Sequence, residues 1–177
     1  MNSKDLQKFI DKAKSLEKGH QMDLSSGEDL SVAIMNLIGI EEHMFFTSQK
    51  LGDTKYIDVL NTAREMRKEL MKKIVKEGQG EVWCTSKHLL SASMRLMEVG
   101  TKSLTKGDKK EANDYFKKSF DLYNLFWSLN LGLIKPDNSV ETHHDASLPV
   151  KEKPLPTKDF LGKVGQTINK ILDCCRE

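Results

Sequence analysis

Short glycine-containing breaks divide the first 131 residues into long segments whose apolar residues recur with a period near 3.6. The breaks fall at Gly19 and at residues 52–53, 78–80 and 107–108. Glycine with a polar neighbour ends helices and forms turns, and this period is that of an α-helix with one buried face. The pattern predicts five helices, over about residues 3–18, 28–51, 54–77, 81–105 and 109–131.

Connections this short favour antiparallel packing of consecutive helices. We therefore predict an all-α protein in which residues 1–131 form an antiparallel helical bundle of four to five long helices. Residues 132–156 contain all four prolines, which interrupt helices, and are predicted to be a tether. Residues 157–177 are predicted to carry a C-terminal amphipathic helix with one apolar stripe. The stripe consists of Phe160, Leu161, Val164, Ile168, Ile171 and Leu172.

Charge and cysteine content argue against several classes of protein. The 28 Lys and Arg residues nearly balance 26 Asp and Glu residues, whereas nucleic-acid binders usually carry a basic excess. Three cysteines, Cys84, Cys174 and Cys175, do not make a disulfide framework. Residues 1–18 lack the apolar run of a signal peptide, and the longest apolar-rich stretch, 32–40, is too short to span a bilayer. We expect a cytoplasmic protein without a membrane span.

The second predicted helix is apolar around most of its circumference. Apolar side chains occur at nearly every angle between Val32 and Phe46. A helix of this kind is usually surrounded by other helices. We therefore expect it to be either the central helix of the bundle or the face of an oligomer.

Two charged residues fall in the middle of the apolar arcs of neighbouring helices. Glu41 lies on the inward arc of the second helix, and Arg67 lies on that of the third. At ~1.5 Å per residue, Glu41 is about 15 Å before the turn at 52–53 and Arg67 is about 20 Å after it. We predict a buried or half-buried Glu41–Arg67 pair, which either fixes the register of the helices or contacts a ligand.

The fifth predicted helix carries an aromatic stripe, which at helical spacing is more often core than a cofactor site. Tyr123 and Asn130 lie on its inward arc and need hydrogen-bond partners there. Tyr123 could join Glu41 and Arg67 in a polar pocket for a small molecule. The simpler alternative is that these groups satisfy their hydrogen bonds locally.

One group of residues has the spacing of metal ligands. Glu81, Cys84 and His88 occupy positions i, i+3 and i+7, which share one helix face, and Cys and His are ligands of Zn²⁺. That face is opposite the apolar stripe, so the alternative is a surface histidine beside a half-exposed thiol. The second to fifth predicted helices contain no Glu-x-x-His motif of a di-iron bundle, and we expect no cofactor.

No catalytic motif points to an enzyme. The sequence has no glycine-rich phosphate loop, no Gly-x-Ser-x-Gly and no His-Glu-x-x-His. Cys84 with His88 could form a thiolate pair, but no third group is available to orient it. Whether the chain is an enzyme stays open, and the sequence favours the view that it is not.

Residues 96–124 resemble a tetratricopeptide unit, a helix–turn–helix repeat. The matching positions are Gly100, Gly107, Ala112 and Phe116. The positions that depart from the family pattern are Ser103, Ser119 and Asn124. No second copy follows at the required period of about 34 residues. The resemblance implies an α-hairpin at this place and no particular partner.

These observations favour a non-enzymatic helical scaffold or adaptor that binds another protein or itself. The tethered helix would dock on its own bundle, on a partner or on a second protomer. The first alternative is a bundle that binds a small molecule or a metal through the residues named above. The second is an RNA-associated domain, suggested by a basic strip of Lys68, Lys72, Lys73 and Lys76 and opposed by the balanced net charge.

Overall fold

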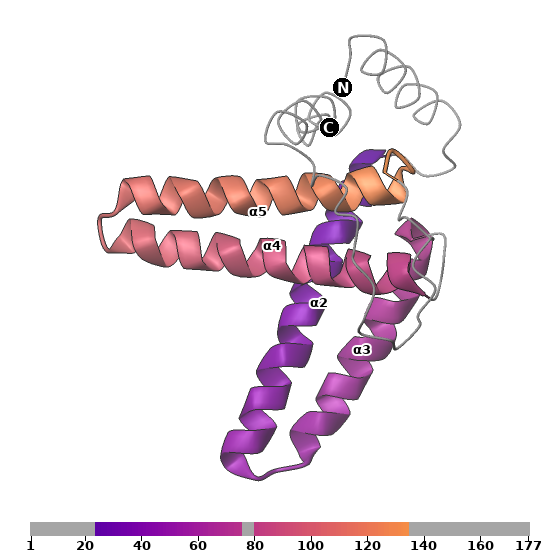
Figure 1. Ribbon diagram of the computed structural model, residues 1–177. Helices are drawn as coiled ribbons and strands as arrows, with labels where there is room; N and C mark the ends of the chain where they lie inside the picture. Colours follow the sequence, from indigo (N-terminus) through magenta and orange to yellow (C-terminus); the bar gives the residue numbers. More distant parts are fainter. Residues whose placement is uncertain (1–23, 76–79, 135–177) are drawn as a thin grey trace, which may run out of the picture.

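The computed structural model describes residues 24–75 and 80–134, and these residues form four α-helices and no strand. The helices are labelled as in Figure 1. Their bounds are α2 Leu24–Leu51, α3 Lys55–Ile74, α4 Glu81–Thr105 and α5 Lys109–Asn130. The prediction of an all-helical chain is confirmed for the described residues. The first predicted helix and the C-terminal apolar stripe lie outside them.

The helices form two antiparallel hairpins, α2–α3 and α4–α5, as the short connections predict. Gly52 and Gly107 have φ values of 63° and 85°, a left-handed conformation that other residues rarely adopt. The Asp108 carboxylate then accepts a hydrogen bond from the Glu111 N–H at 2.9 Å, which caps the start of α5. The helix boundaries agree with the sequence prediction, except that α2 begins at Leu24 and α3 ends at Ile74.

The two hairpins cross at a steep angle, so the four helices do not lie side by side (Figure 1). Where they cross, apolar residues from all four helices form one core. Its buried members are Ile34, Met35, Met71, Ile74, Val75, Leu90, Phe126, Trp127 and Leu131. Beyond this core each hairpin continues as a separate arm, and we name them the α2–α3 arm (residues 39–67) and the α4–α5 arm (residues 93–120).

Small residues hold α4 close against α5. Ser86, Ser93 and Gly100 recur every seven residues along α4, and Ala112 and Ser119 are also seven apart on α5. Ser93 Oγ donates to the Ser119 carbonyl at 2.9 Å, and Ser119 Oγ donates to the Ser93 carbonyl at 2.7 Å. A Cβ atom at Gly100 would lie 2.6 Å from the Phe116 ring and 3.2 Å from the Ala112 carbonyl oxygen. These contacts hold α4 against α5 between Ser93 and Gly100 without residues of α2 or α3.

The chain packs back on the core immediately after α5. Gly132 has a φ of 66°, and the Leu133 N–H donates to the Ser128 carbonyl at 2.8 Å. This backbone reversal satisfies carbonyls at the end of the helix and returns Leu133 to the core. The first residues of the predicted tether, 132–134, thus belong to the packed part of the protein.

Candidate interaction site

The crossing creates a recess in the angle between α2 and α4, which we name the crook. Its cavity has a volume of about 680 Å³. The lining from α2 includes Met35, Gly39, Glu42, Phe46 and Lys50, and the lining from α4 includes Ser91, Met94, Arg95 and Glu98. The crook therefore combines apolar side chains from both hairpins with charged groups of both signs.

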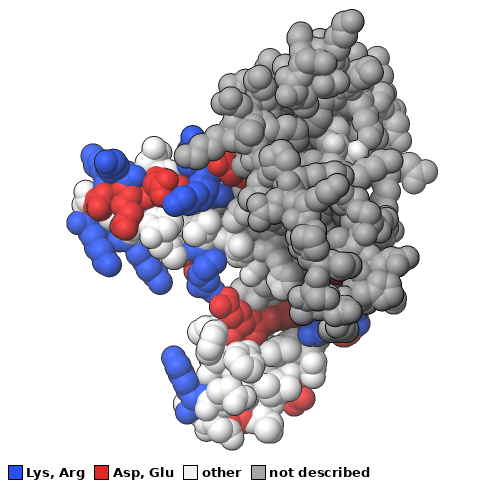
Figure 2. Space-filling view, in the orientation of Figure 1, with Lys and Arg blue, Asp and Glu red and all other residues white. Residues whose placement is uncertain are grey.

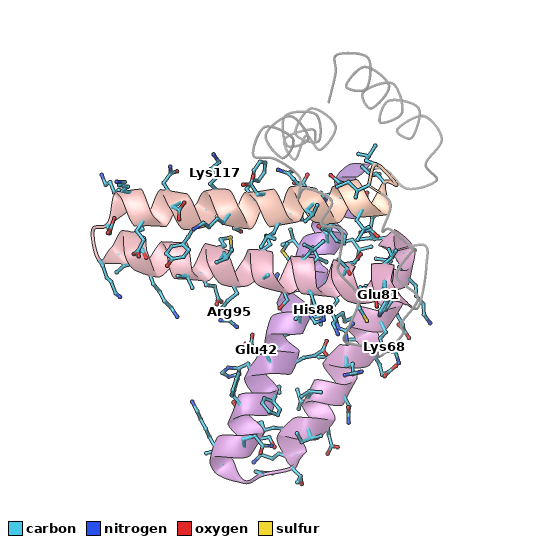
Figure 3. All side chains as sticks on the ribbon, in the orientation of Figure 1. Glu42, Lys68, Glu81, His88, Arg95 and Lys117 are labelled. Atoms are coloured by element: carbon cyan, nitrogen blue, oxygen red, sulfur yellow. The ribbon has the colours of Figure 1, made fainter. Side chains whose placement is uncertain are left out.

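An ion pair joins the two hairpins across the crook. Arg95 on α4 donates to the carboxylates of Glu42 on α2 and of Glu98 one turn further along α4. The side chains of Arg95 and Glu42 point toward each other in Figure 3. All three side chains are partly exposed, so water weakens the attraction and the pair contributes more to the orientation of the arms than to stability.

The α2–α3 arm exposes large apolar side chains. Phe45 and Phe46 are 47% and 52% exposed, and their rings lie edge to face with 5.3 Å between centroids. Ile40, Leu51, Val59 and Met66 on the same arm are also exposed. In the view of Figure 2 this arm is mostly uncharged, whereas the α4–α5 arm is dense with Lys, Arg, Asp and Glu. The expectation that α2 is central holds for Ile34 and Met35 in the core and not for its second half.

The predicted contact between Glu41 and Arg67 is present between α2 and α3. Arg67 is 3% exposed, and its guanidinium meets the Glu41 carboxylate through two nitrogens, with Nη2 3.2 Å from Oε2. The remaining nitrogen, Nη1, lies 3.5 Å from the Met71 sulfur. Ile34 and Ile74 stand seven residues further toward the core, so the pair occupies one layer of the hairpin seam. Burial of a paired charge fixes the register of the two helices.

Tyr123 contacts Ser31 on α2 and not the Glu41–Arg67 pair. Its hydroxyl lies 2.6 Å from Ser31 Oγ on α2, and Ser31 Oγ also donates to the Glu28 carbonyl at 2.7 Å. Because the Ser31 proton is used there, Tyr123 must donate to Ser31. Burial raises the pKa of Tyr123 above its ordinary value of 10.0, which keeps that donor proton in place. The described contacts do not join Tyr123 to the Glu41–Arg67 pair.

Glu81, Cys84 and His88 do not form a cluster that could bind a metal ion. All three side chains are exposed on α4, and Cys84 is a free thiol. Glu81 and His88 are labelled on that helix in Figure 3. Within residues 24–75 and 80–134, no group of three or more His, Cys, Asp or Glu side chains is placed to hold a metal ion. The geometry gives these residues the surroundings of surface side chains.

Two contacts between the hairpins have no counterpart in the sequence analysis, Glu42–Arg95 and Ser31–Tyr123. They depend on the angle at which the hairpins cross, and helical periodicity carries no information on that angle. Lys68, from the predicted basic strip, pairs with Glu65 at 2.8 Å on the same helix. The residues proposed for interaction in the C-terminal helix, 160–172, lie outside the described part of the chain.

The described residues define an all-α protein of two crossed α-hairpins. No protein-family model, no curated protein and no solved structure matches the chain. The α-hairpin that residues 96–124 were expected to form is present as the outer parts of α4 and α5. None of the four described helices has the length and apolar character needed to cross a bilayer.

Proposed function

We propose that this protein is a non-enzymatic helical adaptor that binds a protein chain through its α2–α3 arm. The observation that carries the proposal is the exposed aromatic pair of Phe45 and Phe46, on an arm where Ile40, Leu51, Val59 and Met66 are also exposed. Isolated exposed apolar residues are common, but clustered ones mark interaction surfaces. Aromatic residues are also enriched among those that dominate binding energy. The exposed free thiol of Cys84 suits a reducing compartment, and we place the protein in the cytoplasm.

The shape of the molecule supports an exposed arm as the binding element. The arm keeps its register through the Glu41–Arg67 pair, so its outer side chains stand on a rigid support. A rigid support lowers the entropy lost on binding. The crook adds a recess beside the arm, in which a side chain or helix of the bound protein finds apolar contacts with Met35, Met94 and Phe46.

The test is photo-crosslinking of the full-length protein in its own cells. A photoreactive phenylalanine analogue replaces Phe45, and a matched control carries it at the exposed Lys110 on the α4–α5 arm. We expect covalent adducts with a discrete protein chain from position 45 and few or none from position 110. The adduct should disappear when Phe46→Ser is added, because that change removes half of the aromatic pair.

Equal adducts from both positions, or no adduct from position 45, would overturn the proposed function. Thermal unfolding of each variant shows that the fold is intact. Phe45 and Phe46 contribute little to the core, so the melting temperature should stay close to that of the parent protein.

A specific observation favours a second candidate, the binding of a small apolar ligand. A cavity of about 310 Å³ lies between α2, α4 and α5, close to the lower limit for ligand pockets. Its apolar lining includes Val32, Met35, Met94, Met97, Phe116 and Phe120. Flexible methionine side chains adapt to ligands of varied shape. Native mass spectrometry of the purified protein tests this candidate, since a bound ligand of constant mass supports it and a bare chain argues against it.

A further inference from the structure

The crook-facing side of α2 carries a stripe of three evenly spaced residues. Glu42, Phe46 and Lys50 follow one another at intervals of four residues, which places them on one face of the helix, and all three line the crook. The order along the stripe is acid, aromatic, base. Lys50 has no ion-pair partner among the described residues, and Phe46 is about half exposed.

The same face contains a glycine that the fold does not require. Gly39 is in the interior of α2, where glycine weakens a helix relative to alanine. Its φ is not positive, and a Cβ atom built on it would meet nothing within 4 Å. Gly100 on α4 is different, because a Cβ atom there would collide with Phe116. No contact of the described residues explains the missing side chain at Gly39, which leaves open space in the crook.

From this pattern we infer that the partner of the crook is a second copy of this chain, with the two α2 stripes packed antiparallel about a two-fold axis at Phe46. The inference rests on the proposed function and names its partner. In a two-fold contact the same patch serves both protomers, so it must be complementary to itself. An acid–aromatic–base stripe meets this condition only when the two helices run antiparallel.

The register follows from the stripe. With Phe46 opposite Phe46 of the second copy, each Lys50 faces a Glu42, since both residues are four positions from the centre. The same register brings the turn at residues 52–54 of one copy to Gly39 of the other. The open space at Gly39 then accommodates this turn. Glu42 keeps its contact with Arg95 and gains a second cation, which extends the ion pair into a network.

The decisive experiment mixes two charge variants of the full-length protein. Lys50→Glu alone places a glutamate opposite Glu42 in both facing pairs, and Glu42→Lys alone places a lysine opposite Lys50 in both facing pairs. We expect each variant alone to associate about tenfold more weakly than the parent chain, because like charges oppose each other across the contact. The one-to-one mixture should recover dimers, since both facing pairs are then of opposite charge. Sedimentation velocity over a concentration series measures association, and native mass spectrometry identifies the mixed dimer.

Two further variants locate the contact. Gly39→Leu fills the space that the turn at residues 52–54 of the second copy would occupy. This variant should abolish the dimer while the isolated chain stays folded. Lys110→Glu on the α4–α5 arm changes the same charge away from the stripe and should leave the dimer intact. A parent chain that stays monomeric throughout, single-charge variants that associate as tightly as the parent, or a mixture that recovers no dimer would overturn the inference.

The experiments distinguish the failure of this inference from the failure of the proposed function. If the parent chain is monomeric but the analogue at position 45 still forms an adduct with a different protein, the adaptor function stands and the second copy is excluded. If position 45 forms no adduct with any chain, the proposed function falls and this inference falls with it.

Discussion

The two arms have the same topology and opposite chemistry. In the α4–α5 arm, Ser93, Gly100 and Ser119 bring the helices close together, and many of the groups left outside are charged, although Met97, Leu104 and Phe120 are also exposed. In the α2–α3 arm, Glu41 and Arg67 occupy the seam, and apolar groups such as Phe46 remain outside. The comparison shows that a hairpin can extend beyond its core in two ways, with a seam of small residues or with a seam that holds a buried ion pair.

The seam of the α2–α3 arm should give the largest effect. Glu41→Ala leaves the Arg67 guanidinium buried without its carboxylate, and we expect a loss of about 3 kcal/mol of unfolding free energy. The double variant Glu41→Leu with Arg67→Leu removes both charges and should recover most of this loss. Urea unfolding followed by circular dichroism measures both. A single variant as stable as the parent would show that the pair does not hold the seam.

The glycines of the two arms should respond with opposite signs. Gly100→Leu forces a side chain against Phe116 and the Ala112 carbonyl and should cost about 1–3 kcal/mol. Gly39→Leu meets open space and improves helix propensity, so the isolated chain should gain about 0.5–1 kcal/mol. Thermal unfolding at a protein concentration low enough to keep the chain monomeric measures the stability of both variants. Equal losses at both glycines would contradict the distinction between the closed seam at Gly100 and the open crook at Gly39.

The smallest effect concerns the hydrogen bond between Tyr123 and Ser31, which joins the two hairpins, and this effect depends on pH. The raised pKa of Tyr123 means that the folded protein holds the phenol proton more tightly than the unfolded chain does. This contribution is complete below pH 10 and is lost as the pH rises through the folded-state pKa. Above pH 10 the parent should therefore lose stability more steeply than Tyr123→Phe, whose stability at neutral pH should be lower by about 1 kcal/mol. Parallel alkaline unfolding curves would exclude this role.

The sequence is sufficient for features that depend on one helix or one turn. Gly52 and Gly107 mark the turns, and helical arcs identify Glu41 and Arg67 as partners because a short turn aligns the two helices in register. The crossing of the hairpins could not be predicted in this way. It depends on how Ile34, Leu90 and Trp127 fit together in three dimensions, and such a fit leaves no period in the sequence.

The same limit explains what was missed at the candidate site. The crook exists only because the hairpins cross, so neither Arg95 nor Glu42 is recognisable as part of a recess from its own helix. The close packing of α4 against α5 does correspond to a sequence pattern, the seven-residue spacing of Ser86, Ser93 and Gly100. Small residues stand out less than apolar ones when helical periodicity is used to find a buried face. The spacing of these residues is therefore sufficient to predict the register of α4 against α5.

The position of the core at one end of both hairpins has a consequence for motion. Ile34 and Phe126 belong to a core that contains residues of every described helix. We therefore expect the backbone amides beside them to exchange with deuterated solvent only when the whole structure opens. Amides near the turns at Gly52 and Gly107 lie beyond that core and exchange through local separation of two helices. Protection should therefore decrease outward along each arm, from the shared core to the turn.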